Sequence, residues 1–562
     1  MGVSVEKIWL QSYQEGVPAE VDLGEFQSLG EMFQNSVTLY RDRVVFINMG
    51  AEMTYGELDA LSRDFAAYLQ TSLKLQKGDR VAIMMPNVLQ YPVCMLGALR
   101  AGCVVVNCNP LYTPRELEHQ LKDSGAETIV VLENFAHTLA HVIAQTSIKN
   151  VVIARMGDLL GFAKGALVNF VVKHVKKMVP AWRIPGAVDF GRAISQGAAS
   201  GFTPVSVTQD DLAYLQYTGG TTGLSKGAML THGNILANLS QAHAWIKAEL
   251  KEGEELVVTA LPLYHIFALT ANCFLFMRIG ARNLLITNPR DLKSFVSDLA
   301  KYPFTVILGV NSLFNLLLNN EAFKTLDFRT LKITLGGGMA VQSSIAEKWK
   351  RLTGVPLIEA YGLTETSPAA VINPLNNSEY TGAIGLPISS TDVAIRNDDG
   401  IDVPLGERGE LCIRGPQVMK AYYHRPEETA NVMMPDGFLR TGDIVVMDEK
   451  GYIKIVDRKK DMILVSGFNV YPNEVEEVVA MHPGVLEVAS VGVATEGAGE
   501  VVKIFVVKKD ESLTAEQLIA HCRANLTGYK VPRQVEFRKD LPKSNVGKIL
   551  RRELREWRSE QQ

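Results

Sequence analysis

The sequence predicts an α/β protein with a large amino-terminal region and a small carboxy-terminal α+β domain. Three observations lead to this prediction: the length of 562 residues, the alternation of strand-like apolar runs with amphipathic segments up to about residue 456, and a change of pattern beyond it. Hydrophobic residues make up 47% and charged residues 21%, which is a globular balance. The chain is therefore long enough for several domains with large cores.

The amino-terminal region contains short, almost entirely apolar runs at 80–85, 128–132, 150–154 and 305–308. Such runs are typical of parallel strands buried on both faces, so we expect two layered α/β subdomains. From about 382 to 456, runs at 392–396 and 410–414 are separated by turns. This part predicts a small β-barrel-like subdomain.

The last hundred residues predict a compact α+β domain. Pro472 suits the first turn of a helix, and Glu474 and Glu476 suit its positive end. Strand-like runs follow at 488–493 and 501–507, and Thr514 is the expected N-cap of a helix that ends near residue 526. We place the amino-terminal domain at 1–456, a charged connection at 457–461 and the carboxy-terminal domain at 462–562.

Net charge and cysteine usage exclude several classes of protein. A formal charge of −4 does not favour a nucleic-acid-binding surface, so we expect no nucleic acid partner. None of the six cysteines forms a CxxC pair, which argues against a zinc site or a disulfide framework. The first residues lack the apolar core of a signal peptide, and no apolar run reaches membrane-spanning length. We expect a cytoplasmic protein.

One segment, residues 157–180, combines apolar side chains with Lys164, Lys173, Lys176 and Lys177. A helix with this composition is typical of an anionic membrane interface. The alternative is a helix packed on its domain with the lysines in solvent. Both interpretations stay open, and the first predicts a peripheral contact with the inner face of the membrane.

The most informative stretch is residues 217–227, where glycines and hydroxyl residues precede Lys226 without a break. Such a backbone can turn its N–H groups onto an anion, and the hydroxyls and the ammonium add further donors. Ser225 precedes the lysine and Gly227 follows it, which differs from the Walker loop. The stretch therefore predicts a phosphate-binding loop of another kind.

Four further strings follow this loop along the chain, at 361–366, 440–443, 457–461 and 542–548. In this order the five strings resemble the acyl-adenylate-forming superfamily, and the stretches 436–460 and 465–472 are most similar to bacterial long-chain fatty acyl-CoA synthetases. The resemblance implies that a fatty carboxylate attacks the α-phosphorus of ATP, and that coenzyme A then displaces AMP from the acyl-AMP. It also implies that the carboxy-terminal domain is mobile.

The resemblance implies roles for residues that the composition alone could not assign. ATP would be bound by Thr218, Gly219, Gly220, Thr221, Thr222, Gly223, Lys226, Gly337, Gly338, Glu359, Ala360, Tyr361, Gly362, Thr364, Asp443, Arg458 and Lys548. Thr218 and Glu365 would hold Mg²⁺, which prefers oxygen ligands. Lys548, Glu365 and Lys226 would be catalytic, and Lys548 would bridge the carboxylate and the α-phosphate.

Acyl and coenzyme A sites are expected from the resemblance together with the apolar pattern of residues 304–318. The acyl residues would be Tyr264, His265, Val310, Phe314 and Gly336, although the run 304–318 is equally typical of an ordinary helix core. Coenzyme A would contact Ser466, Gly467 and Phe468 after a rotation about Asp457.

Several questions stay open at this level. An aryl or short-acid CoA ligase, or a non-catalytic acyl-nucleotide-binding protein, is the alternative function. Chain length and oligomeric state, including a homodimer, cannot be read from the sequence.

Overall fold

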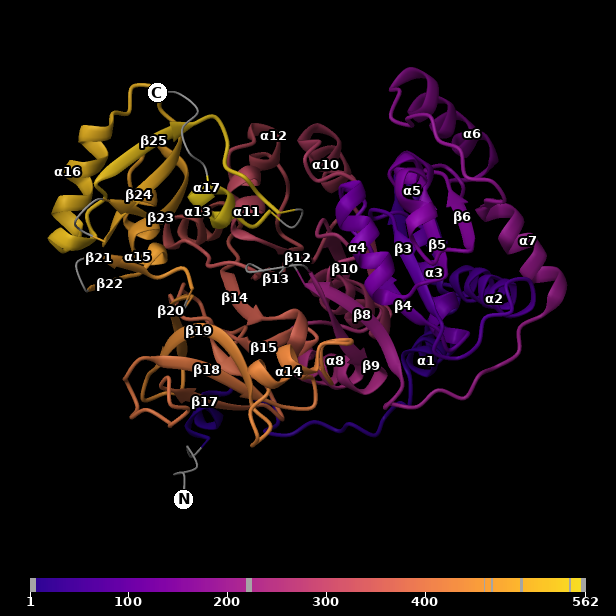
Figure 1. The fold of residues 1–562 in the computed structure, drawn as a ribbon, viewed down its shortest axis with the longest axis horizontal. Helices are drawn as coiled ribbons and strands as arrows, with labels where there is room; N and C mark the ends of the chain where they lie inside the picture. The colour runs from indigo at the N-terminus through magenta and orange to yellow at the C-terminus, as the bar shows by residue number, and fades with distance from the viewer. Residues whose placement is uncertain are drawn as a thin grey trace.

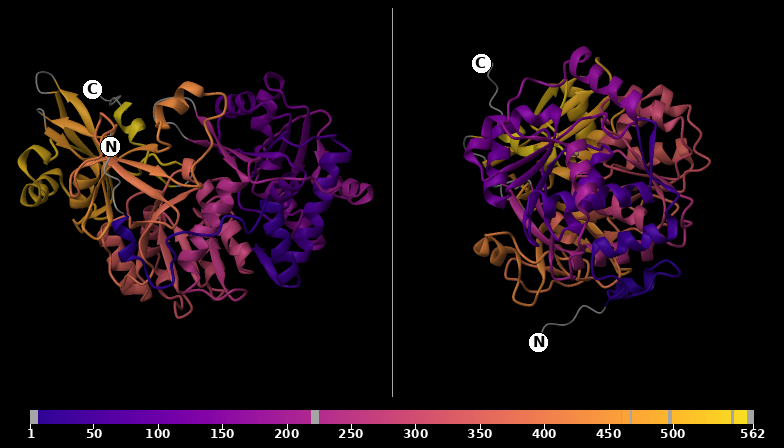
Figure 2. Two further views of the ribbon diagram at one scale, coloured as in Figure 1. Left: turned by 90° about the horizontal axis from the view of Figure 1, so that it is seen from below. Right: turned by 90° about the vertical axis from the view of Figure 1, so that its right-hand side faces the viewer.

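The computed structural model describes residues 7–218, 225–458, 460–465, 468–495, 499–544 and 547–556, with only the backbone of Arg458, Phe468, Thr495 and Glu556. The described chain forms sheets of seven, nine, four and five strands. The carboxy-terminal domain and the seven-stranded sheet lie at opposite ends of the molecule, with the nine-stranded sheet between them (Figures 1 and 2). The predicted fold class, a large α/β region followed by a smaller domain, is confirmed.

The seven-stranded sheet is covered by helices on both faces. It is parallel except for its edge strand β9, and its strands in spatial order are β7 (Val188–Asp189), β6 (Asn150–Ala154), β5 (Thr128–Leu132), β3 (Arg80–Met84), β4 (Val104–Asn107), β8 (Leu212–Thr218) and β9 (Lys226–Thr231). Alternate residues of β3 enter two separate cores: Val81 packs with α2 (Tyr55–Thr71), α3 (Gln90–Arg100) and α7 (Phe190–Ser200), and Ala82 with α4 (Pro114–Ser124) and α5 (Ala136–Val142). Burial on both faces explains the continuous apolar runs in the sequence.

The nine-stranded sheet supplies the edge on which the candidate site is built. Its strands in spatial order are β16 (Leu386–Pro387), β15 (Ala369–Ile372), β14 (Leu357–Gly362), β13 (Ile333–Gly336), β12 (Val306–Gly309), β10 (Leu256–Thr259), β11 (Arg282–Leu285), β1 (Val44–Asn48) and β2 (Ala51–Thr54). The strands from β14 to β1 are parallel, so their carboxyl ends share one edge. Ligands of open parallel sheets bind beyond this edge.

Helices of this region include one interrupted by π-helical geometry. They are α1 (Leu29–Tyr40), α8 (His232–Ile246), the π-helix η5 (Ala268–Phe274) continued by α9 (Leu275–Arg278), α10 (Leu292–Leu299), α11 (Asn311–Leu318), α12 (Glu321–Lys324) and α13 (Ser343–Thr353). A π-helical stretch inside a helix is often found at a functional site.

The β-rich segment forms a four-stranded antiparallel sheet of β17 (Asp392–Arg396), β18 (Gly409–Arg414), β19 (Leu439–Met447) and β20 (Ile453–Arg458). Among the described residues no ladder joins β17 to β20, so the sheet stays open rather than closing as a barrel. The helix α14 (Pro426–Val432) lies between β18 and β19 in sequence. This sheet carries the candidate ribose-binding residue Asp443 on β19.

The carboxy-terminal domain has the expected α+β elements. Its sheet contains β22 (Phe468–Val470), β21 (Ile463–Val465), β24 (Gly499–Lys508), β23 (Val485–Thr495) and β25 (Gln534–Arg538), and its helices are α15 (Pro472–Ala480), α16 (Ala515–Asn525) and α17 (Arg551–Glu556). Pro472 lies in the first turn of α15, and Thr514 caps α16 through a capping box, as predicted.

The segment 157–180 projects from the seven-stranded sheet (Figure 1). It forms α6 (Phe162–Phe170) and the π-helical turn η4 (Val171–Val175). The Phe162 side chain is 97% exposed, and Leu167, Phe170 and Val175 are also exposed. The segment also contacts the domain, because Gly165 is buried, Val168 packs against the core and Lys173 pairs with Glu133 at 2.7 Å. Both interpretations of the segment therefore stay open. No helix in the described ranges is long and apolar enough to cross a membrane.

Candidate active site

A cavity of about 1990 Å³ lies where the nine-stranded sheet, the four-stranded sheet and the carboxy-terminal domain meet. Its wall includes Lys226, Glu365, Asp443 and Lys548, which are far apart in sequence. The fold therefore brings together charged residues that the sequence analysis could only align in order along the chain.

The phosphate-binding loop is the connection of a β-hairpin. Thr218 ends β8 and is paired with Lys226, the first residue of β9, and both line the cavity. Gly219, Gly220, Thr221, Thr222 and Gly223 lie outside the described residues. The Lys226 ammonium forms an ion pair with Glu428 and lies 5.0 Å from the centroid of the Tyr422 ring. A bound polyphosphate would have to compete with Glu428 for this cation.

Glu365 lies in the short 3₁₀ turn Thr364–Thr366 and lines the same cavity. Its Oε1 accepts a hydrogen bond of 2.6 Å from the Tyr422 hydroxyl, and its backbone oxygen accepts one of 2.7 Å from Met419 N. The side chain is thus oriented by the loop after β18. No cluster of three or more His, Cys, Asp or Glu ligands occurs among the described residues, so any metal here would depend on Glu365, Thr218 and ligands from substrate or water.

The residues expected around the adenine lie at the ends of β13 and β14. A Cβ on Gly337 would lie 3.1 Å from the Phe267 ring and 3.2 Å from Ala360 O, which explains the glycine. Glu359 is 7% exposed and accepts a hydrogen bond of 3.1 Å from Val341 N. Its burial raises the pKa of the carboxyl to about 8, so it is mostly protonated at neutral pH. Gly338, Ala360, Gly362 and Thr364 also line the cavity.

Tyr361 and Asp443 connect β14 to the four-stranded sheet. The Tyr361 hydroxyl donates a hydrogen bond of 2.6 Å to Asp443 Oδ2, and both residues are at most 9% exposed. Asp443 N in turn donates to Thr441 Oγ1 at 3.1 Å. Arg458 is opposite Asp443 in the β19–β20 ladder, and its side chain lies outside the described part of the structure. The aspartate is held rigidly at the cavity wall.

Lys548 reaches the cavity from a tight turn of the carboxy-terminal domain. Lys548 N donates to Ser544 Oγ at 3.1 Å, and Ser544 N donates to Lys548 O at 2.7 Å. The turn is docked on α11, where Ser312 Oγ donates to Gly547 O at 3.0 Å. Burial of the imidazole lowers the pKa of His265 to about 4, and the nearby charge of Lys548 makes a smaller contribution in the same direction. The imidazole is therefore neutral and faces a cationic part of the cavity.

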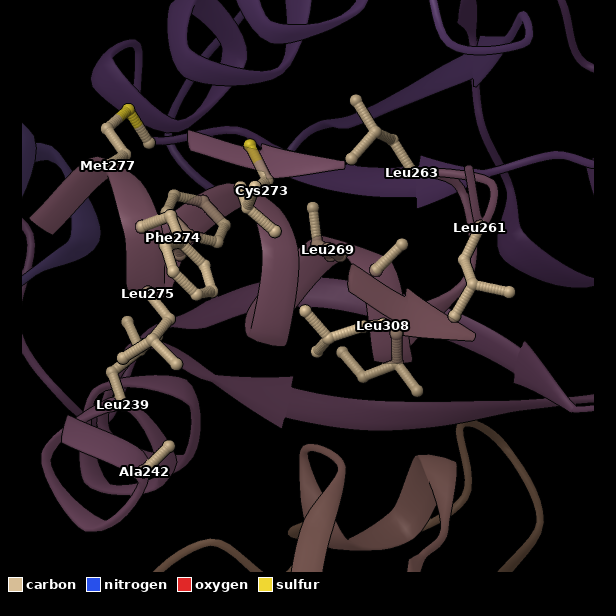
Figure 3. Packing of buried hydrophobic residues seen from close by; sticks show 14 of the residues in the cluster. Leu239, Ala242, Leu261, Leu263, Leu269, Cys273, Phe274, Leu275, Met277 and Leu308 are labelled. Carbon is tan, nitrogen blue, oxygen red and sulfur yellow. The ribbon is translucent and has the colours of Figure 1, made fainter. Parts of the chain in front are cut away.

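The apolar part of the cavity extends between α8 and the nine-stranded sheet. Ala242 of α8, Leu275 of α9 and Leu308 of β12 line it, and all three are labelled among the buried residues of Figure 3. The predicted residues Tyr264 and His265 line the cavity as well.

The other three predicted acyl residues lie elsewhere. Phe314 is fully buried with its ring 4.8 Å from Trp349, because its face of α11 packs on α13. Val310 and Gly336 pack in the same core, where a Cβ on Gly336 would meet Val341 at 2.6 Å. The alternative interpretation of 304–318 as helix core therefore describes Phe314, and Leu308 and Leu335 line the cavity.

Of the predicted coenzyme A residues, only Phe468 belongs to the described part of the structure. Ser466 and Gly467 are outside the described residues, and Phe468 begins β22 at the edge of the five-stranded sheet. Asp457, the predicted hinge, is fully buried at the end of β20. Its Oδ2 accepts a hydrogen bond of 3.0 Å from Asn473 N, and its Oδ1 lies 4.0 Å from the Arg551 guanidinium.

Sequence reasoning missed Tyr422 and Glu428, which contact Glu365 and Lys226. Both come from the loop and helix between β18 and β19, and neither belongs to a spaced motif. No signal in a single sequence connects them to the phosphate-binding loop.

Comparison with known proteins gives consistent matches over the whole chain. The model of the AMP-binding enzyme family matches residues 33–423, and that of the AMP-binding enzyme C-terminal domain matches residues 474–548. A long-chain-fatty-acid–CoA ligase of Yersinia pestis is 60% identical, and the match covers 98% of each chain. One of Haemophilus influenzae is 55% identical with the same coverage.

Solved structures agree with the fold. A benzoate CoA ligase from Burkholderia xenovorans LB400 is similar with a TM-score of 0.81 and 25% identity, covering 94% of this chain and 100% of that one. An anthranilate CoA ligase in complex with anthranoyl-AMP has a TM-score of 0.84 at 22% identity, covering 94% of this chain and 97% of that one, and shows the fold alone.

Proposed function

The chain belongs to the family of AMP-binding enzymes, and on this premise we propose that it is an ATP-dependent long-chain fatty acid–CoA ligase. The observation that carries the proposal is the single cavity that joins charged residues for a nucleotide to an apolar part between α8 and the sheet. The similarity to long-chain-fatty-acid–CoA ligases at 55–60% identity supports the same activity. The apolar part favours a fatty acid over an aryl or short acid.

The reaction needs two anions to meet. A carboxylate oxygen attacks the α-phosphorus, the bond to the β-phosphate breaks, and pyrophosphate leaves with the electron pair. The thiolate of coenzyme A then attacks the acyl carbon, and AMP leaves. We assign the neutralisation of the meeting anions to Lys548 and Lys226, because both lysines line the cavity. Fixed cations at the place where charge develops are an effective means of lowering such a barrier.

The remaining ATP contacts are assigned by position. We propose that Asp443 accepts hydrogen bonds from the ribose hydroxyls and that the protonated Glu359 and the close backbone of Gly337 border the base. For Mg²⁺ the available donors are the Glu365 carboxylate and the Thr218 hydroxyl, which fit a hard cation that keeps several water or phosphate ligands. When bound, the ion would neutralise charge on the phosphates.

Coenzyme A needs access to the position that Lys548 now occupies. We propose that the carboxy-terminal domain rotates about Asp457 after adenylation and brings the turn 466–468 to the cavity. The contacts of Ser312 and Asn315 with this domain are then specific to the adenylating orientation.

The direct test is Lys548→Ala assayed in each half-reaction. With ATP and palmitate-type acid but no coenzyme A, pyrophosphate release should fall by roughly two to three orders of magnitude, the usual effect of removing a transition-state charge donor. Thioester formation from supplied acyl-AMP should persist. Near-normal pyrophosphate release by the variant would remove Lys548 from its proposed role. Absence of any acid-dependent release by the wild type would instead argue for a non-catalytic nucleotide-binding protein.

We further propose that α6 and the η4 turn contact an anionic membrane, which would place the enzyme peripherally at its cytoplasmic face. Phe162, Leu167, Phe170 and Val175 expose apolar area beside lysines, a combination that suits an interface. Sedimentation with phosphatidylglycerol vesicles should capture the wild type and lose Phe162→Ser. Equal capture of both would contradict the contact.

A homodimer stays a prediction. Light scattering over a concentration series measures the mass directly.

A further inference from the structure

The amino-terminal segment, residues 7–22, lies across the end of α8 and reaches the β15–β16 connection and the four-stranded sheet. Ser12 Oγ donates to Lys450 O at 2.7 Å, and the Tyr13 hydroxyl donates to Pro387 O at 2.5 Å. Trp9 is 1% exposed. The segment contains the short 3₁₀ helix Ile8–Ser12 and is fixed to the body by the buried Trp9 side chain and these two hydrogen bonds, so it is part of the wall of the amino-terminal domain.

The cavity wall follows one face of α8. Asn238, Ala242, Trp245 and Ile246 line it, at helical spacings of four, three and one residues. Asn238 marks the end nearest the nucleotide, because it hydrogen bonds both backbone groups of Ala369, which closely follows Glu365. Trp245 and Ile246 therefore mark the far end, two turns away along the helix.

Trp245 is held in place from several directions. It is fully buried, and its indole Nε1 donates to Asn373 O at 3.1 Å. The Tyr13 ring packs edge-on against it with centroids 5.1 Å apart. The indole thus separates the cavity from the amino-terminal segment.

Gln14 joins the two sides of this closed end. Its Nε2 donates to Trp245 O at 2.6 Å, and its Oε1 accepts from Leu375 N at 2.6 Å. Leu375 also lines the cavity. With 7% exposure, the Gln14 amide has both of these bonds in a buried environment, where losing either leaves a backbone group unpaired.

From these contacts we infer that Trp245, backed by Tyr13 and Gln14 of the amino-terminal segment, closes the acyl part of the cavity and sets the longest fatty acid that the enzyme accepts. The inference rests on the proposed function. Trp245 and Gln14 act by different means: the indole occupies space that a longer chain would need, and the Gln14 amide positions the end of α8 against Leu375.

The test is the dependence of kcat/KM on chain length, from 8 to 22 carbons, for thioester formation. Trp245→Ala should raise kcat/KM for acids longer than the wild-type optimum relative to shorter ones, by about fourfold for each methylene that gains a buried position. Ala242→Phe fills the cavity one turn nearer the nucleotide and should move the optimum to shorter acids. Trp182→Ala, which removes an indole packed on the seven-stranded sheet, is the matched control and should leave the profile unchanged.

Gln14→Ala separates the inference from general destabilisation. It should broaden the profile toward long acids in the same direction as Trp245→Ala, whereas a merely structural role would lower kcat/KM equally at all lengths. If Trp245→Ala does not fold, the chain-length profiles of Gln14→Ala and Ala242→Phe test the inference. Profiles of folded variants that coincide with that of the wild type would overturn the inference. No thioester from any acid with the wild type would instead contradict the proposed function itself.

Discussion

Two hydrogen bonds hold the carboxy-terminal domain in the orientation that brings Lys548 into the cavity, and removing them gives a sharp test of the two-step mechanism. Ser312 Oγ donates to Gly547 O at 3.0 Å, and Asn315 Nδ2 donates to Leu486 O at 2.9 Å. Both donors lie on α11 of the amino-terminal domain. The double variant Ser312→Ala/Asn315→Ala therefore removes both contacts between the domains, and within the amino-terminal domain it removes the exposed bond from Asn319 Nδ2 to Asn315 Oδ1.

The magnitude follows from the number of bonds. A partly buried neutral hydrogen bond contributes about 1 kcal/mol net, so the pair contributes about 2 kcal/mol, or roughly thirtyfold in the population of this orientation. Pyrophosphate release without coenzyme A should fall by up to about thirtyfold. Thioester formation from supplied acyl-AMP should keep its rate or increase, because it uses the other orientation.

The assay compares both half-reactions in the double variant, in each single variant and in Leu316→Ala. Leu316 is on the same helix with 41% exposure and serves as the control for changes to α11 itself. Equal loss in both half-reactions would refute the reasoning, since it would indicate damage to the site rather than a shift between orientations. An unaltered rate of adenylation would show that these bonds do not hold the domain.

Three further predictions concern the Tyr361–Asp443 hydrogen bond at the candidate ribose site and the pH dependence of stability through Glu359 and His232. Tyr361→Phe removes a short hydrogen bond to the buried Asp443 carboxylate, worth about 2 kcal/mol, and should raise the KM for ATP by roughly thirtyfold in steady-state kinetics, with an unchanged KM contradicting the assignment. The raised pKa of Glu359 contributes stability that is complete below pH 4.5 and is lost as pH rises to about 8. Between pH 5 and pH 8.5 this loss is about 4 kcal/mol, and Glu359→Gln should remove it, as measured by urea unfolding at these two pH values. If the free energy of unfolding falls equally in both proteins between pH 5 and pH 8.5, Glu359 is ionised in the folded protein. Burial lowers the pKa of His232 to about 4, so its contribution is complete above pH 6.5 and is lost as pH falls to 4. His232→Leu should therefore reduce by about 3 kcal/mol the free energy of unfolding that is lost between pH 6.5 and pH 4. An equal loss in the variant and the wild type over this pH range would contradict a neutral imidazole.

Local sequence determined the elements of this protein. The runs at 80–85, 128–132 and 150–154 became adjacent parallel strands, because a strand covered by helices on both faces must be apolar at every position. The helix beginning at Pro472 and the N-cap at Thr514 depend on interactions within a few residues, which a sequence displays directly. The charged residues of the candidate site were found for a similar reason, since each lies in a short string with its own chemistry.

Only the tertiary structure decided which side chains share the cavity. Val310 and Phe314 have the same apolar pattern as residues that line it, yet the packing of α11 on α13 turns Phe314 away. Tyr422 and Glu428 contact Glu365 and Lys226 through a loop that no spacing rule connects to them. Gln14 and Trp245 are 231 residues apart. Contacts of this kind depend on how separate layers pack, and periodicity along one chain carries no information about which surfaces will meet.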